Sequence, residues 1–213
     1  MKKTLLLAAF LNLFLTAYCQ RFECGTASEW MKTQTGTING LDNKVSMKKS
    51  STSDIQYIPI KIWFIRNDDG SYSKHDDINV LYHSIGQTNR LLSQVGIQLM
   101  VHNLEYVDNS NLLKFNINDA PTLFASHKDA GAANIYIIDN FTDALGNIVS
   151  YSGYGSPDAV YLSDITEGTF PHEFGHFFTL DHTFDTGNGV ELVNGSNCAT
   201  AGDKICDTHA DPG

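Results

Sequence analysis

Three histidines and a glutamate in one short segment are the residues best suited to chemistry. The segment reads His172-Glu173-Phe174-Gly175-His176-Phe177-Phe178-Thr179-Leu180-Asp181-His182. Residues four apart lie on one face of a helix, so His172 and His176 can present their imidazoles to a single ion. His182 lies beyond the expected helix end, and a chain that turns back there brings a third imidazole to the same metal. Three nitrogen ligands with one open position are typical of catalytic zinc, so we expect one zinc ion.

Glu173 stands between these ligands and need not bind the metal itself, which leaves its carboxylate free as a base. Zinc lowers the pKa of bound water from 15.7 toward roughly 7 and polarises a scissile carbonyl. Glu173 would take the water's proton and later deliver it to the leaving amine. The pattern therefore predicts hydrolysis of protein or peptide substrates. A lone His-Glu-x-x-His can arise by chance on an ordinary helix, but the third histidine favours zinc.

The elements that must position this motif follow from the apolar pattern. Residues 58–65 have the β-branched and aromatic character of a strand. Residues 77–94 show helical spacing that ends at Gly96. Further strands are expected at 97–101, with an extension to Val107 left open, and then in two short apolar runs, 134–139 and 159–162. This order predicts an α/β (α+β) domain with a mixed sheet, a backing helix and a helix that carries the zinc motif.

The N-terminal segment 1–19 is typical of a secretory signal peptide, with a basic start at Lys2 and Lys3 and an apolar stretch to Ala17. The apolar run is short for a membrane span of about 20 residues. A lipoprotein signal with Cys19 as the modified residue is a lower-ranked alternative. We therefore expect a secreted, extracellular protein in which disulfides can form. Residues 20–54 are polar and predict a removable pro-region.

Bulk composition excludes some classes of function. The chain has 213 residues, which suits one domain with short extra segments, and its formal net charge is −10. Nucleic-acid binding needs a basic face, so we expect no nucleic-acid partner. We also expect a monomer without a stable membrane span.

The motif and its flanks resemble the pappalysin (ulilysin-like) family of metzincins. Thr183-Phe184 after the zinc motif is similar to the family's His-Thr-Phe, and the segment Cys198 to Thr208 resembles its Cys…Gly-Asp…Asp-Thr region. The likeness covers roughly residues 55–213. It implies a zincin-like fold with a twisted mixed sheet, and a secreted zinc metalloendopeptidase made as a latent precursor.

The resemblance also implies further site residues. Cys24, in Arg21-Phe22-Glu23-Cys24-Gly25-Thr26, matches a pro-region cysteine whose thiolate would occupy the fourth zinc position until cleavage near 48–56. The alternative is an unpaired or intermolecularly paired cysteine. Cys198 and Cys206 can pair with each other or with other partners. Candidate calcium ligands are the Asp203 and Thr208 side chains and the Gly202 and Ile205 carbonyls, the alternative being an ordinary polar loop.

Two departures from the family pattern qualify these expectations. Thr179 stands where metzincins have the glycine that lets the helix end, and a β-branched residue is strained at positive φ. Asp181 is therefore a fallback third ligand. All 4 Met precede the motif, so no methionine-containing turn follows it, and we expect a C-terminally truncated catalytic domain (55–213) with an incomplete C-terminal subdomain. The alternative function is a catalytically silent secreted metal-binding relative or fragment with a binding role.

Side chains around the motif are expected to be structural. The aromatic ones are interpreted as core packing rather than substrate contacts: Phe174, Phe177, Phe178 and Phe184. The remaining histidines are interpreted as surface or structural residues: His75, His83, His102, His127 and His209.

Overall fold

The computed structural model describes residues 23–24, 55–71 and 77–210. The predicted signal peptide and most of the predicted pro-region lie outside these residues, as does His75. Nine strands are found among them, β1 (Glu23–Cys24), β2 (Gln56–Arg66), β3 (Ile97–Asp108), β4 (Lys114–Asn116), β5 (Ala133–Ile137), β6 (Asn140–Thr142), β7 (Ile148–Val149), β8 (Tyr151–Gly155) and β9 (Ala159–Leu162). The α-helices are α3 (Ile78–Leu92), α4 (Ala120–Ser126) and α5 (Thr169–Phe177), and short 3₁₀ turns occupy Ser93–Val95, Ser110–Leu112 and Ile117–Asp119.

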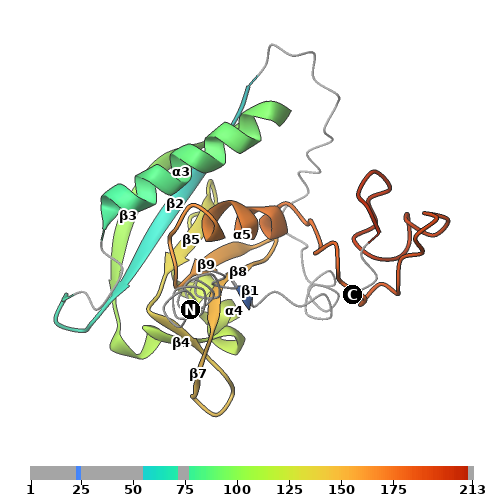
Figure 1. Cartoon of the computed structure of the whole chain (residues 1–213). Helices are drawn as coiled ribbons and strands as arrows, with labels where there is room; N and C mark the ends of the chain where they lie inside the picture. The colour runs from blue at the N-terminus through green and yellow to red at the C-terminus, as the bar shows by residue number, and fades with distance from the viewer. Residues whose placement is uncertain (1–22, 25–54, 72–76, 211–213) are drawn as a thin grey trace, which may run out of the picture.

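A six-stranded sheet with the order β1-β8-β9-β5-β2-β3 forms the centre of the molecule. β8 runs antiparallel to β9, whereas the other neighbouring pairs, including β1 with β8, are parallel. The predicted mixed sheet is therefore confirmed. Figure 1 shows α3 and α5 side by side on one face of this sheet, and α3 follows the direction of β2 and β3.

The two faces of the sheet bury separate apolar clusters, because alternate residues of a strand point to opposite faces. Ile60, Ile62 and Phe64 of β2 pack with buried side chains of α3 and α5. Trp63 and Ile65 of the same strand pack on the other face with α4 and the strands β4 and β6. Strands covered on both faces read as continuous apolar runs, which is why β2, β5 and β9 were predictable.

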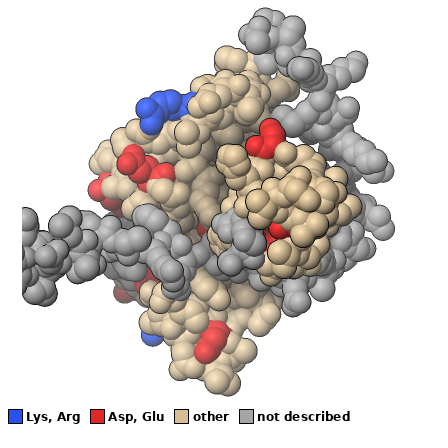
Figure 2. Space-filling view, turned by 45° about the vertical axis from the view of Figure 1, so that its right-hand side comes forward, with Lys and Arg blue, Asp and Glu red and all other residues tan. Residues whose placement is uncertain are grey.

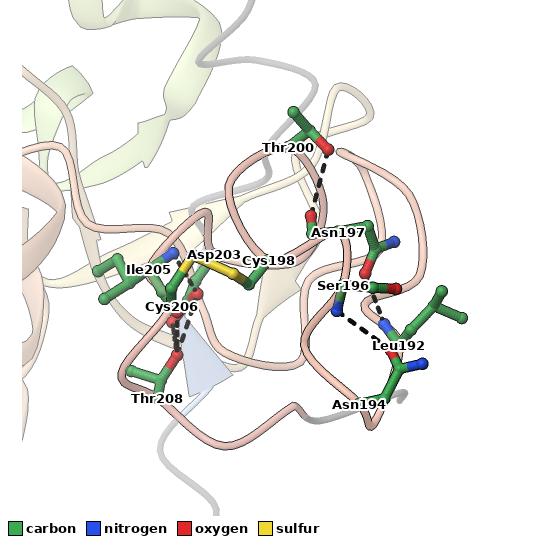
Figure 3. Close-up of a disulfide and its surroundings, with 10 residues drawn as sticks. All are labelled: Leu192, Asn194, Ser196, Asn197, Cys198, Thr200, Asp203, Ile205, Cys206 and Thr208. Atoms are coloured by element: carbon green, nitrogen blue, oxygen red, sulfur yellow. Dashed lines mark hydrogen bonds between the residues drawn. A yellow bond between two sulfur atoms is a disulfide. The ribbon is translucent and has the colours of Figure 1, made fainter.

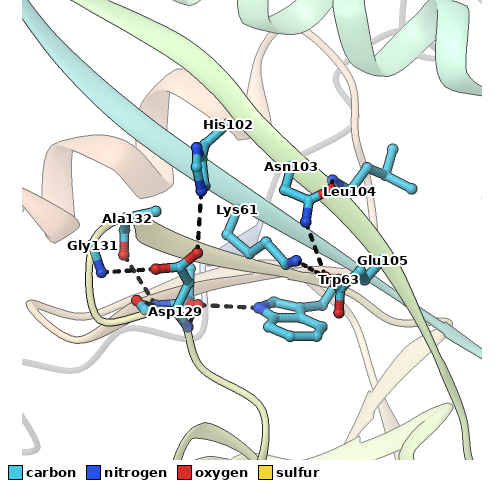
Figure 4. A network of polar contacts seen from close by, with 10 residues as sticks. Lys61, Trp63, His102, Asn103, Leu104, Glu105, Asp129, Gly131 and Ala132 are labelled. Carbon is cyan, nitrogen blue, oxygen red and sulfur yellow. Dashed lines mark hydrogen bonds and ion pairs between the residues drawn. The ribbon is translucent and has the colours of Figure 1, made fainter.

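A buried lysine interrupts the apolar lining of β2. Lys61 is 3 % exposed, forms an ion pair with Glu105 of β3, and lies 4.5 Å from the centre of the Trp63 ring. Nearby, His102 Nε2 lies 3.5 Å from Asp129 Oδ2, and Figure 4 shows this pair beside Lys61 and Trp63. The register between β2 and β3 shifts here, where Ile60 pairs with Val101 but Lys61 pairs with Asn103. The bulge on β3 thus aims Glu105 at the lysine and neutralises its charge.

The chain after α5 contains no helix or strand up to residue 210, and Figure 1 shows it leaving the sheet beyond α5. It consists of turns and irregular chain, and a disulfide joins Cys198 to Cys206. In the described residues no helix has the length and apolar character needed to cross a membrane. Figure 2 shows a face on which uncharged side chains predominate, and the charged side chains drawn there are dispersed rather than gathered into a basic surface.

Candidate metal centre

The helix α5 is fixed in the core by one of its faces, and this orients the motif. Phe170 and Phe174 are 0 % and 1 % exposed and stack with their ring centres 5.2 Å apart. Before the helix, the Asp164 carboxylate accepts hydrogen bonds from the hydroxyls of Thr166 (2.9 Å) and Thr169 (3.0 Å). The two phenylalanines are buried in the core, and the hydrogen bonds to Asp164 hold the start of the helix in place. His172 and His176 lie on another face of the same helix, so the orientation of the helix fixes theirs as well.

The three predicted zinc ligands converge. The Nε2 atoms of His172 and His176 lie 3.3 Å apart, and the Nε2 atom of His182 lies 3.2 Å from the first and 3.1 Å from the second. Two ligand nitrogens of a tetrahedral zinc site with Zn–N bonds near 2.05 Å lie about 3.3 Å apart. Within the described residues, this group brings three metal-ligating side chains within reach of a single ion. The spacing fits zinc.

The protonation state of the three rings also suits a cation. The Leu180 carbonyl can only accept, so His176 donates to it from Nδ1 at 2.7 Å, and its Nε2 carries a lone pair in the neutral ring. Burial lowers the pKa of His172, His176 and His182, and the neighbouring rings lower it further. Three neutral imidazoles whose Nε2 atoms face one another have lone pairs that a bound cation would satisfy.

The helix α5 ends in a left-handed turn at Thr179, the position at which the sequence suggested strain. Thr179 has a φ of 68°, and its N–H donates to the His176 carbonyl at 2.8 Å. The Leu180 N–H donates to the Gly175 carbonyl at 3.0 Å, which completes the bond pair of a Schellman cap. Thr179 thus makes the left-handed turn for which the resemblance led us to expect glycine, and His182 reaches the other two histidines in spite of the β-branched side chain.

Asp181, the fallback ligand, does not join the metal group. Its carboxylate accepts from Lys204 Nζ at 3.1 Å and from Asn188 Nδ2 at 3.0 Å, on the side of the C-terminal segment. The interpretation of Phe184 as a core residue is wrong. The residue is 55 % exposed, and its ring stacks on His182 at 4.7 Å between ring centres. Phe184 follows the turn that carries His182, and this turn lies outside the apolar core.

The other aromatic and histidine predictions are confirmed where the structure describes the residue. Phe174 is buried, and Phe177 and Phe178 pack against the same cluster. The exposed His83 and His102 lie near Glu167 and Asp129 respectively, outside the metal group.

Two glycines of β8 were missed by sequence reasoning. A Cβ on Gly153 would lie 2.5 Å from Cγ of Glu173, and a Cβ on Gly155 would lie 2.3 Å from the Glu173 carbonyl oxygen. Both distances are shorter than real Cβ contacts, so the strand lies directly against the Glu173 side chain at Gly153 and against the helix backbone at Gly155. Glu173 is consequently 1 % exposed. The available signal was two glycines two residues apart, which lie on one face of a strand.

The same strand pairs with β1, which lies in the segment predicted to be a pro-region. β1 pairs in parallel with β8 along its outer edge, with Glu23 opposite Tyr151 and Cys24 opposite Gly153. Cys24 therefore lies across from the glycine that contacts Glu173.

The candidate calcium ligands come together in part. The Thr208 hydroxyl oxygen lies 2.9 Å from the Asp203 carboxylate and 2.8 Å from the Ile205 carbonyl oxygen, so three oxygens of the set converge. The Gly202 carbonyl instead accepts from Asn188 Nδ2 at 3.0 Å. Figure 3 shows this cluster beside the disulfide, with Asp203, Ile205 and Thr208 close to Cys206. The pairing of Cys198 with Cys206, left open by the sequence, is settled in favour of an internal bond.

The sequence matches a known protein-family model. The model described as pregnancy-associated plasma protein-A, a peptidase family, matches residues 100–213. That range includes the three histidines, Glu173, both cysteines of the disulfide and the Asp203 loop. No curated protein matches the chain significantly.

Proposed function

Since the chain belongs to the peptidase family of pregnancy-associated plasma protein-A, whose members are zinc metallopeptidases, we propose that it is a secreted zinc metalloendopeptidase made as a latent precursor. The observation that carries the proposal is the convergence of the three histidine Nε2 atoms at 3.1–3.3 Å beside the buried Glu173. Membership of the family implies the zinc peptidase activity. The catalytic role of Glu173, the secretion and the latency are our additional proposals.

His172, His176 and His182 would hold the zinc, which when bound lowers the pKa of a water molecule and polarises the substrate carbonyl. Glu173 comes one residue after the first ligand on the same helix, so its carboxylate is placed to accept a proton from water. It would then deliver that proton to the leaving amine. The β8 glycines bring the strand against Glu173 and shield it from bulk solvent. A shielded carboxylate interacts more strongly with the charge that develops in the reaction.

The proposed latency rests on β1. An extended peptide can add to the exposed edge of a sheet through main-chain hydrogen bonds. β1 takes up the outer edge of β8, the strand that lies against Glu173, so a substrate that added there would have to displace it. Cys24, opposite Gly153, is our candidate for the thiolate that fills the fourth zinc position. Cleavage of the pro-region would release both obstacles at once.

A calcium ion at Asp203, Ile205 and Thr208 is also proposed, on the strength of their converging oxygens. Hard cations prefer carboxylate, hydroxyl and carbonyl ligands. With zinc retained, a calcium chelator should lower the thermal stability of the C-terminal segment, and unchanged stability would argue against the ion.

The first test compares the secreted parent chain with its Glu173→Gln variant, which keeps the size of the side chain. Metal content and casein hydrolysis are measured together after limited trypsin treatment. We expect about one zinc per chain in both proteins and hydrolysis in the parent alone. Zinc without hydrolysis in the parent would favour the alternative, a catalytically silent metal-binding relative. Absence of zinc from the parent would refute the proposal.

The latency has its own test, in which Cys24→Ala is compared with the parent before trypsin is added. The variant should hydrolyse casein measurably before activation, because the fourth zinc position is open to water, but more slowly than after trypsin treatment, because β1 still covers the edge of β8. A variant as latent as the parent would show that Cys24 does not hold the precursor inactive.

A further inference from the structure

Asp181 connects the turn that carries His182 to the C-terminal segment. Its side chain is 9 % exposed and directly precedes the third histidine. Lys204 Nζ donates to its carboxylate at 3.1 Å, and Asn188 Nδ2 donates to the same oxygen at 3.0 Å. The Asn188 amide also donates to the Gly202 carbonyl at 3.0 Å. The Asp181 carboxylate therefore contacts Lys204 directly and Gly202 through the Asn188 amide.

Lys204 is itself held in place. It lies within the ring that the Cys198–Cys206 disulfide closes, here called the disulfide loop (residues 198–206). Its backbone has a φ of 62°, and its N–H donates to the Ala201 carbonyl at 3.1 Å. On its C-terminal side, the Ile205 N–H donates to the Asp203 carboxylate at 2.9 Å. The ammonium that meets Asp181 is thus presented by a constrained loop.

The turn that carries His182 has reason to need such a support. Thr179 holds a left-handed conformation, which costs about 1–2 kcal/mol for a residue with a Cβ. His182 is contacted by Phe184, but that ring is 55 % exposed and does not bury the imidazole. In contrast to His172 and His176, the third ligand receives no support from the apolar core through a helix. Its position depends on side-chain and turn contacts.

A simple surface ion pair would have little influence on the site, since exposed pairs contribute about 0–1 kcal/mol. This pair is asymmetric, with Asp181 at 9 % and Lys204 at 48 % exposure. Removal of Lys204 leaves a mostly buried carboxylate with a single neutral donor, and removal of Asp181 frees the turn from the loop. Either change should act on His182, the next residue.

We propose that Asp181 is a positioning residue that fastens the His182 turn to the disulfide loop, and so sets the affinity of the three histidines for zinc. The inference rests on the zinc site of the proposed function. Loss of an outer partner of a metal ligand costs about 10–100-fold in metal affinity, and the same range is expected here.

The test uses the full chain and measures the zinc dissociation constant by chelator competition. The variants are Asp181→Ala, Lys204→Met, the two combined, and Lys114→Met as a control that removes an exposed lysine of β4, a strand that packs on the sheet face opposite α5. Asp181→Ala and Lys204→Met should each bind zinc about 10–100-fold more weakly, and the double variant no more weakly than the worse single one. Lys114→Met should match the parent. Asp181→Asn, which keeps a neutral acceptor, should recover most of the affinity.

A second readout separates positioning from general destabilisation. The visible absorption of the cobalt(II)-substituted protein reports the ligand geometry, and it should change in Asp181→Ala and Lys204→Met but not in Lys114→Met. The double variant Cys198→Ser/Cys206→Ser should weaken zinc binding in the same range, since it releases the loop that presents Lys204. If Asp181→Ala does not fold, Lys204→Met, which changes an exposed side chain, still tests the contact.

Parent-like affinity and cobalt spectrum in Asp181→Ala or in Lys204→Met would overturn the inference and leave the proposed function standing. Parent-like affinity in the disulfide-free variant would equally overturn the role of the loop. Absence of zinc binding in the parent itself would refute the proposed function, and the inference with it.

Discussion

The helix α5 and the segment that follows it, residues 178–210, hold their metal ligands by different means. α5 inserts Phe170 and Phe174 into the apolar core, and its backbone lies directly against Gly155 of β8. The following segment has no helix or strand and depends on turns, one disulfide and the contacts of Asp181. The positions of His172 and His176 are therefore lost only when the sheet unfolds, whereas the position of His182 is lost when its local contacts open. Zinc would join the two regions.

Gly155→Ala tests the support of α5 by the sheet, and we expect it to cause the largest loss of stability. The new Cβ would lie 2.3 Å from the Glu173 carbonyl oxygen, so the helix must move away from the sheet. Overpacking of this kind costs about 1–3 kcal/mol, and backbone contact places this variant at the upper end. Thermal unfolding should show a melting temperature lower by roughly 6–12 °C.

Gly86→Ala is the matched control for this substitution. Gly86 lies within α3, and a Cβ there would meet no atom within 4 Å. Alanine should stabilise the helix by about 0.5–1 kcal/mol. A Gly155→Ala protein as stable as the parent would show that β8 does not press on α5 as described.

The pH dependence of the zinc-free protein should be the next largest effect. Burial lowers the histidine pKa values of the site below the usual 6.5, so the unfolded chain binds more protons than the folded one. Their contribution to stability is therefore complete above pH 6.5 and is lost as the pH falls through the folded-state values. Thermal unfolding after chelation, between pH 8 and pH 5, measures this loss.

Substitution of single histidines distinguishes the unfolding of α5 from that of the segment 178–210. His176→Gln should flatten the pH dependence of global unfolding, because α5 unfolds with the sheet. His182→Gln should flatten it less, because the segment 178–210 can open locally before the sheet unfolds. Equal effects of the two substitutions would mean that both regions unfold as one unit.

The smallest effect is expected from Thr179→Gly. Glycine relieves the left-handed strain of about 1–2 kcal/mol but loses more conformational entropy on folding. A net gain in stability below about 1 kcal/mol should result, with zinc affinity equal to or higher than that of the parent. Thr183→Gly, at an exposed position without positive φ, should lower stability instead. Destabilisation by Thr179→Gly would show that the threonine side chain makes a contact worth more than the strain.

Much of the sheet was predictable from local pattern. β2, β5 and β9 are buried on both faces and appear as apolar runs, and α3 shows helical spacing up to the turn at Gly96. β8 was missed, because three of its five residues are serine or glycine and it lacks the β-branched residues typical of strands. The short strands β4, β6 and β7 are two or three residues long, too short for a periodicity to be recognised.

The candidate site divides in the same way. Spacing along a helix is a local property, so it was enough to identify His172, His176 and Glu173 and to suggest His182. The contact between β8 and Glu173 joins residues that are distant in sequence. Nothing in either segment alone gives the distance at which a strand and a helix pack.

Residue types and their spacing thus decided which atoms can bind zinc and which carboxylate can act as a base. Tertiary structure decided that Thr179 turns the chain through a left-handed conformation and that Asp181 faces Lys204 rather than the metal. The physical reason is that a ligand set follows from chemistry within one segment. A strained turn, by contrast, persists only when contacts from elsewhere in the fold hold it.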